Sequence, residues 1–271
     1  MVMAEKLITV ENLSVSFDGK TVLRDASFSI DKGDVLAIIG PNGSGKTLLI
    51  KSILGLQEHT GQVIWHSQPE TSYVPQKMGF EKGFPLTVKE FFLLETGGRD
   101  SFWLPSAQKE KEIEERLKEA GLGHLLNSRL GDLSQGEAQR MLIARSLLEN
   151  PEIIFFDEPA AAVDISAEET VYKILHNIHQ KTNMTMVIIS HELSVVYNFA
   201  TKVICLNRDL ICQGAPAEVL TPENLQKLYG HHTAFHNHNH NDNNQQVDDV
   251  ESEVQTSAEP AQTITDQHDH I

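Results

Sequence analysis

The fold is decided by residues 35–50, VLAIIGPNGSGKTLLI, in which an apolar run leads through a glycine-rich segment into a second apolar run. The run at 35–40 predicts a buried strand, and residues 45–56 have the pattern of a helix. The segment between them, 40–47, matches G-x-x-x-x-G-K-[ST] in full and lies where that phosphate-binding motif must lie. A glycine-rich turn that matches by chance is the alternative, and the strand–loop–helix context disfavours it. The sequence therefore predicts a nucleotide-phosphate site.

This motif binds phosphate because its glycines let successive backbone N–H groups turn inward around the oxygens. The helix that follows adds the partial positive charge of its N-terminus. Lys46 is expected to reach the β- and γ-phosphates, and the Thr47 hydroxyl to bind Mg²⁺. The predicted nucleotide-binding residues here are Gly40, Pro41, Asn42, Gly43, Ser44, Gly45, Lys46, Thr47 and Leu48.

A second apolar run, IIFFD at 153–157, is followed by Glu158, so that two carboxylates stand at its end. Such a run predicts a buried strand whose acids lie at the C-terminal edge of the sheet, where open α/β sheets bind ligands. Asp157 is expected to hold Mg²⁺, and Glu158 to polarise the attacking water. Asp–Glu pairs are common in solvated turns, so the prediction of hydrolysis at the γ-phosphate rests on their combination with Lys46.

The remaining patterns predict an α/β architecture with strands in a central sheet. Residues 7–17 and 22–30 alternate apolar and polar side chains, as half-exposed antiparallel strands do, and Asp18-Gly19 supplies their turn. Residues 185–190, TMVIIS, predict another buried strand, and residues 202–214 a terminal hairpin.

Helical patterns at 135–149 and 166–180 lie between the predicted core strands. Residues 85–130 differ, because they combine a proline-flanked helix candidate, a glycine-containing loop and a narrowly amphipathic helix. We therefore predict one globular domain at 1–230 with a helical subdomain inserted at about 85–150.

Composition and charge exclude several classes of protein. The chain has 271 residues, 40% of them hydrophobic, and no apolar run approaches the ~20 residues of a membrane helix. Its net charge is −16, and the sequence lacks the clusters of Lys and Arg that would predict a nucleic-acid partner. The two cysteines, Cys205 and Cys212, form no C-x-x-C pair, so two buried thiols in a reducing cytosol are expected.

Further motifs occur in a characteristic order, and each has an ordinary structural alternative. Gln76 could be a turn residue, His191 a satisfied or helix-capping histidine, and Phe17 a core residue of an edge strand. The sequence LSQGE at 133–137 could be a simple helix start, because Ser and a later Glu favour helix N-termini. A further segment, AAVD, ends at Asp164.

Taken together and in this order, these motifs resemble those of the ATP-binding cassette subunits of ABC transporters, over roughly residues 1–230. The resemblance implies a P-loop cassette with an N-terminal antiparallel β-subdomain, a mostly parallel core sheet and an inserted α-helical subdomain. It implies that Phe17 stacks on adenine, that Gln76 binds Mg²⁺ and takes part in catalysis, and that His191 is a catalytic switch residue.

The resemblance also implies that two copies of the chain enclose two ATP molecules. Each ATP would lie between one phosphate loop and the signature of the other copy, so the remaining expected ATP contacts are Ser134, Gln135, Gly136, Glu137 and Asp164. This chain departs from the family pattern at Gln135, Glu137 and Leu48, which replace Gly, Gln and a hydroxyl residue. A side chain at 135 would be strained if that position required a positive φ.

The cargo is suggested by resemblance to the zinc/manganese importer branch, in FPLTVKEF at 84–91 and VICLNRDLICQG at 203–214. The implied partners are a transmembrane permease and an extracytoplasmic metal-binding protein. The implied location is peripheral, on the cytoplasmic face of the membrane. Manganese, iron or another metal remains an open alternative for the cargo. Two alternative functions also remain open: a soluble ABC ATPase that works without a transporter, and a metal buffer whose cassette is degenerate.

Residues 231–271 differ in composition from the rest, with eight acids, no Lys or Arg and seven of the 13 histidines. Such a composition predicts a disordered tail. Imidazole and carboxylate groups suit Zn²⁺, so we expect weak, exchangeable zinc binding, with a solvated linker as the alternative. The candidate ligands are His231, His232, His236, His238 and His240, together with Asp242, His268 and His270.

Overall fold

The computed structural model describes residues 5–76, 80–95, 107–148, 150–160 and 165–230. The chain divides into two compact units, Met1–Thr233 and Ala234–Ile271. The histidine-rich tail at 231–271 and Asp164 lie outside the described residues.

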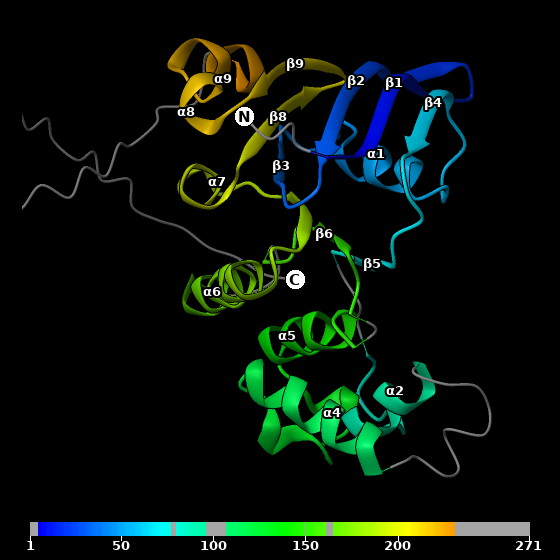
Figure 1. Cartoon of the computed structure of the whole chain (residues 1–271), viewed down its shortest axis with the longest axis vertical. Helices are drawn as coiled ribbons and strands as arrows, with labels where there is room; N and C mark the ends of the chain where they lie inside the picture. The colour runs from blue at the N-terminus through cyan, green and yellow to red at the C-terminus, as the bar shows by residue number, and fades with distance from the viewer. Residues whose placement is uncertain (1–4, 77–79, 96–106, 149, 161–164, 231–271) are drawn as a thin grey trace, which may run out of the picture. The chain divides into compact units, whose positions relative to one another are not determined.

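Within the described ranges the strands form one sheet in the order β4-β1-β2-β9-β8-β3-β7-β6-β5 (Figure 1). The pairs β1–β2, β1–β4 and β8–β9 are antiparallel, whereas β3, β5, β6, β7 and β8 pair in parallel. The predicted α/β fold, with an antiparallel N-terminal part and a mostly parallel core, is confirmed. The strands are β1 Lys6–Phe17, β2 Lys20–Asp31, β3 Val35–Ile39, β4 Thr60–Trp65, β5 Thr71–Val74, β6 Ile153–Asp157, β7 Thr185–Ile189, β8 Lys202–Asn207 and β9 Asp209–Gly214.

Helices cover this sheet, and α2, α4 and α5 gather beside one another away from β1 and β2 (Figure 1). Ile113 and Leu117 of α4 are fully buried in the cluster that also contains residues of α2 and α5. The helices are α1 Lys46–Ile53, α2 Val88–Glu95, α4 Ala107–Glu119, α5 Gln135–Ser146, α6 Ile165–Thr182, α7 Leu193–Phe199, α8 Pro216–Val219 and α9 Pro222–Tyr229, with 3₁₀ turns at Gly123–Leu125 and Leu130–Asp132.

The central strands β3, β6 and β7 are buried along their whole length, as their continuous apolar sequences predict. Successive side chains of β6 enter opposite cores, because side chains alternate along a strand. Ile153 and Phe155 pack in the core that contains α1, whereas Ile154 and Phe156 pack in the core of α5 and α6. Burial on both faces holds the C-terminal ends of these strands, and hence the site, in a fixed place.

The expected pair of free thiols is wrong for this structure, which joins Cys205 and Cys212 in a disulfide. The two cysteines are direct partners in the antiparallel β8–β9 pair, with Cα atoms 5.0 Å apart. That separation lies within the range in which two cysteines can be bridged. The pairing of β8 with β9 therefore brings the two cysteines together, although the sequence contains no C-x-x-C motif.

No helix among the described residues is long and apolar enough to cross a membrane.

Candidate functional site

The phosphate loop lies where the sequence predicts it, between β3 and α1. The loop is closed by Lys46, only 5% exposed, whose Nζ donates to the carbonyl oxygens of Gly40 and Pro41 at 2.9 and 3.1 Å. Gly40 is required there, because a Cβ on it would lie 1.9 Å from the carbonyl oxygen of Leu206. Close packing of the loop against β8 thus fixes the start of the phosphate site.

The loop has the features of an anion cradle. Gly43 and Gly45 have φ values of 77° and 103°, which glycine adopts without strain. Gly45 caps α1, and the first turn of that helix has no acidic residue to neutralise its N-terminus. The buried hydroxyl of Ser44 has no hydrogen-bond partner among the described residues. A buried polar atom without a partner is costly, so a phosphate oxygen at this place would satisfy it.

Asp157, at the end of β6, faces the first helical turn of α1 across the site. Its Oδ1 accepts a hydrogen bond from the Thr47 hydroxyl at 3.0 Å, and its Oδ2 one from the Tyr73 hydroxyl at 3.2 Å. Hydroxyl and carboxylate oxygens are the ligands that Mg²⁺ prefers. Thr47 and Asp157 therefore fit the predicted Mg²⁺ site, and Tyr73, which the sequence reasoning missed, contacts the Asp157 carboxylate through a hydrogen bond.

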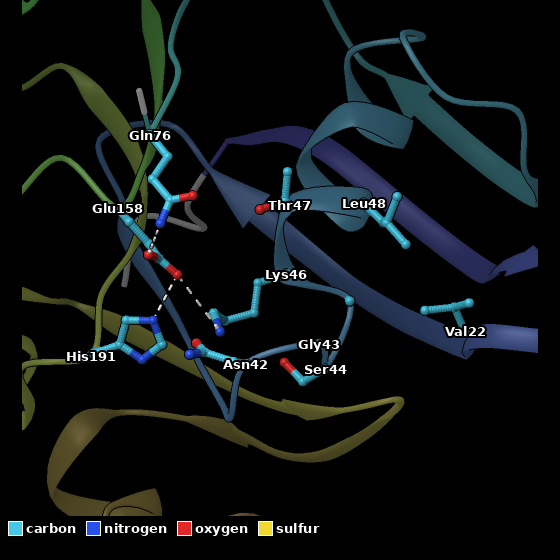
Figure 2. A pocket seen from close by; sticks show the side chains of 11 residues that line it. Val22, Asn42, Gly43, Ser44, Lys46, Thr47, Leu48, Gln76, Glu158 and His191 are labelled. Carbon is cyan, nitrogen blue, oxygen red and sulfur yellow. Dashed lines mark hydrogen bonds and ion pairs between the residues drawn. The ribbon is translucent and has the colours of Figure 1, made fainter. Parts of the chain in front are cut away.

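Glu158 is the centre of the site, as Figure 2 shows. Its Oε2 accepts from Nε2 of Gln76 at 2.5 Å, and its Oε1 lies 2.6 Å from Nε2 of His191. Oε1 is also 3.9 Å from Nζ of Lys46. Glu158 also adopts φ 51°, an uncommon value for a residue with a side chain. The structure thus brings together the four predicted catalytic residues.

Burial dominates the electrostatics of the charged groups in this site. Desolvation lowers the pKa of Lys46, and the neighbouring Glu158 and Asp157 oppose that shift. Desolvation raises the pKa of Asp157, while the hydrogen bonds from Thr47 and Tyr73 act in the opposite direction. Both groups are thus held in an environment that penalises isolated charge, and a cation at Asp157 or an anion at Lys46 would relieve it.

A pocket of about 590 Å³ opens over the loop. It is lined by Asn42, Gly43, Ser44, Gly45, Lys46, Thr47, Leu48, Gln76, Glu158 and His191, all of them predicted, and by Val22, which was not. Phe17, the expected adenine contact, ends β1 with 43% of its side chain exposed and does not line the pocket. Val22 lines the pocket because β2 passes beside the phosphate loop, and no local sequence motif predicts this position.

The signature residues 134–137 form the start of α5 and do not line this pocket. Ser134 is the N-cap, and it forms a capping box with Glu137, whose Oε2 accepts from the Ser134 backbone N–H and hydroxyl at 2.9 and 2.7 Å. These bonds lower the pKa of Glu137. Gln135 is the first helical residue and has no positive φ, so the strain considered for it does not arise.

Known proteins resemble this chain over most of its described part. A sequence model of the family described as ABC transporter matches residues 23–161. The zinc import ATP-binding protein ZnuC of Mannheimia succiniciproducens is 35% identical over 86% of this chain and 86% of its own length. A protein of Thermotoga maritima assigned as the ATP-binding protein of a metal transport system is also 35% identical, over 83% of this chain and 90% of its own.

The fold agrees with these sequence relationships. The solved structure of an inward-facing conformation of a protein assigned as a metal-chelate type ABC transporter superposes with a TM-score of 0.72 and 29% identity. The match covers 83% of this chain and 89% of that chain. Sequence, fold and phosphate site thus agree, and this chain belongs to the ABC transporter family, of which it carries the ATP-binding cassette.

Proposed function

We propose that the chain is the ATP-hydrolysing subunit of a membrane metal importer whose cargo is zinc. The observation that carries the hydrolytic part is the placement of Glu158, which Gln76, His191 and Lys46 hold beside the phosphate loop. The zinc assignment is supported by relatives named for zinc import and by the histidine-rich tail.

In the proposed reaction the substrate ATP places its phosphates on the backbone N–H groups of the loop and on the Lys46 ammonium. Glu158 takes a proton from water as the water oxygen bonds to the γ-phosphorus and the bond to the leaving ADP oxygen breaks. Gln76 and His191 hold the carboxylate in one orientation while this happens. Mg²⁺, when bound, would neutralise phosphate charge, and Thr47, Gln76 and Asp157 would hold it.

A second copy of the chain completes the proposed site. We assign to an ATP bound by another copy the residues at the N-terminus of α5, which lie outside the pocket of their own chain: Ser134, Gln135, Gly136 and Glu137. We assign Asp164 to the same contact between copies, and the adenine contact to Phe17. ATP would then favour a closed dimer and hydrolysis would release it, which gives the importer a two-state element.

The proposed partner in the membrane is a permease. The helical subdomain at about 85–150, together with the segment that follows Gln76, would dock a cytoplasmic helix of that permease. The chain would then lie peripherally on the cytoplasmic face of the membrane, and an extracytoplasmic metal-binding protein would deliver the cargo from the other side. An ABC ATPase that works without a transporter is the alternative, and it requires neither of these partners.

We further propose that the tail at 231–271 binds zinc weakly and reports cytosolic metal to the importer. Histidines separated by Asn, as in residues 236–240, suit exchangeable coordination by a few ligands at a time. A zinc titration of the full chain and of a chain that ends at Gly230 tests this. Equal zinc binding by the two proteins would refute the role of the tail and leave the cassette assignment untouched.

Metal uptake in cells that lack this chain tests the main proposal. The cells receive the wild-type chain or Glu158→Gln, and zinc and manganese uptake are followed in parallel at limiting external concentrations. Restoration of zinc uptake by the wild type alone is the expected result. Restoration of manganese alone would keep the mechanism and change the cargo, whereas no response to either metal would refute the metal-importer assignment.

A further inference from the structure

Tyr172 lies in the middle of α6 and makes a buried polar contact that the proposed mechanism does not use. Its side chain is 9% exposed, and its hydroxyl oxygen lies 2.9 Å from Oγ of Ser190, which is itself 2% exposed. Ser190 follows β7 and immediately precedes His191. The contact therefore connects α6 with the segment that carries the proposed switch histidine.

Ser190 fixes the backbone on both sides of His191. Its own N–H donates to the carbonyl oxygen of Ile38 in β3 at 3.3 Å. Its Oγ accepts from the backbone N–H of Glu192 at 3.1 Å. A hydroxyl has one proton and two lone pairs, and either hydroxyl of the Tyr172–Ser190 pair can be the donor. In both cases the contact with Tyr172 fixes the orientation of the Ser190 hydroxyl and leaves a lone pair for the Glu192 N–H. Without Tyr172 the hydroxyl of Ser190 could rotate, and the turn at His191 would lose its fixed acceptor.

The ring of His191 depends on this backbone for its position. Its side chain is 42% exposed, and it forms a 2.6 Å contact with Glu158 within the part of the chain that the structure describes. A side chain this exposed has little packing to hold it, so its aim toward Glu158 is set by the loop. We propose that Tyr172 is a positioning residue for hydrolysis, acting through Ser190 to hold His191 against Glu158. This inference rests on the hydrolysis proposed above.

Packing alone does not account for a tyrosine at this place. The ring belongs to the core cluster with Val171 and Leu175, and phenylalanine would fill the same space. A buried phenol requires a hydrogen-bond partner, which here is Ser190. Burial raises the pKa of Tyr172 to about 12, with nearby carboxylates adding to the shift. The phenol therefore stays protonated, and the contact persists, at every pH at which the ATPase would work.

The test compares four variants of the purified full chain: Tyr172→Phe, Ser190→Ala, the double variant, and Tyr197→Phe. Tyr197 is a matched control, because it lies in α7 and 56% of its side chain is exposed. ATP binding, kcat and KM are measured over a range of protein concentrations, since the proposed site is completed by a second copy. Circular dichroism establishes that each variant is folded.

Tyr172→Phe is expected to lower kcat about five- to tenfold, the value of one hydrogen bond, while KM and ATP affinity change less than about twofold. Ser190→Ala should lower kcat at least as much. Adding Tyr172→Phe to Ser190→Ala should cause no further loss, because the same contact is already gone. Tyr197→Phe should behave as the wild type does.

Unchanged kcat in Tyr172→Phe would overturn the inference, and so would independent, multiplying losses in the double variant. If Tyr172→Phe raised KM or lowered ATP affinity while kcat stayed unchanged, Tyr172 would be a structural residue and not a positioning residue for hydrolysis. A wild-type chain that binds ATP without hydrolysing it would instead refute the proposed function, and the inference with it. The two failures are therefore distinguishable.

Discussion

Replacing Glu158 by Gln exchanges one carboxylate oxygen for an amide nitrogen at the point where three side chains meet. The new amide can keep its oxygen near His191 and Lys46, which lie 2.6 and 3.9 Å from Oε1. Its NH₂ group then faces Gln76, whose own amide can turn over and accept. The backbone at φ 51° accommodates Gln as it does Glu. We therefore expect Glu158→Gln to fold and to keep the shape of the pocket.

The expected losses differ between binding and chemistry. A positioned general base contributes about 10²- to 10⁴-fold to a rate, so steady-state hydrolysis should fall by that factor. ATP affinity should stay equal or rise, because the substitution removes a negative charge beside the triphosphate. ATP that is bound and not hydrolysed should hold two copies together, so a dimer should persist in ATP and disappear in ADP.

Glu152→Gln provides the control, since Glu152 immediately precedes β6 and Glu158 immediately follows it. Glu152 forms a surface pair with Lys32 at 3.7 Å, far from the phosphate loop, so its variant should hydrolyse ATP normally. Phosphate release, equilibrium ATP binding and size-exclusion chromatography are the measurements. Hydrolysis by Glu158→Gln within about tenfold of the wild type would remove Glu158 from the role of base. Lost ATP binding would assign it to the structure of the loop.

Three further predictions concern other contacts. Lys46→Ala should weaken ATP binding about ten- to a hundredfold in calorimetry, because it removes a buried ammonium that also closes the loop. Glu137→Ala should lower the free energy of unfolding by about 1 kcal/mol at pH 7 in urea titrations, because it removes the carboxylate that accepts hydrogen bonds from Ser134 in the capping box. The folded-state pKa of Glu137 is lowered, so its contribution should be complete above the unfolded pKa and fade as pH falls through the folded value. Protein unfolded without reductant should resist thiol alkylation at Cys205 and Cys212, and labelling of both would show a dithiol.

The strand, the loop and the helix start at 35–50 could be predicted from local sequence because the residues that specify them are neighbours in the chain. A buried strand, closely spaced glycines and a helix start occur within residues 35–50, whereas the packing of Gly40 against Leu206 of β8 could not be read from this stretch. Local sequence likewise predicted the hairpin of β1 and β2, where Asp18 and Gly19 adopt positive φ values of 48° and 75°. The conformation of such elements is determined by the identity of a few consecutive residues.

Other features escaped prediction because they depend on which strands become neighbours. The strand β5 has only the residues Thr71–Val74, too short for a periodic pattern, yet its parallel pairing with β6 places Tyr73 next to Asp157. The disulfide depends on the register of β8 and β9, in which Cys205 lies opposite Cys212. The predicted hairpin at 202–214 already contained both cysteines, but counting residues back from its turn pairs Cys205 with Ile211. A register shift between Cys205 and Leu206 is what brings Cys205 opposite Cys212.

The charged groups of the site lie close to one another within the chain, and this arrangement suggests how ATP would prepare its own hydrolysis. Nζ of Lys46 donates hydrogen bonds to two carbonyl groups of the loop and lies 3.9 Å from Oε1 of Glu158. Phosphate oxygens carry more charge than carbonyl groups, so we expect Lys46 to turn to them when ATP binds. Glu158 would then keep its short contacts with Gln76 and His191 while losing a competing cation. The substrate itself would thus leave the carboxylate oriented and more available to accept a proton from water.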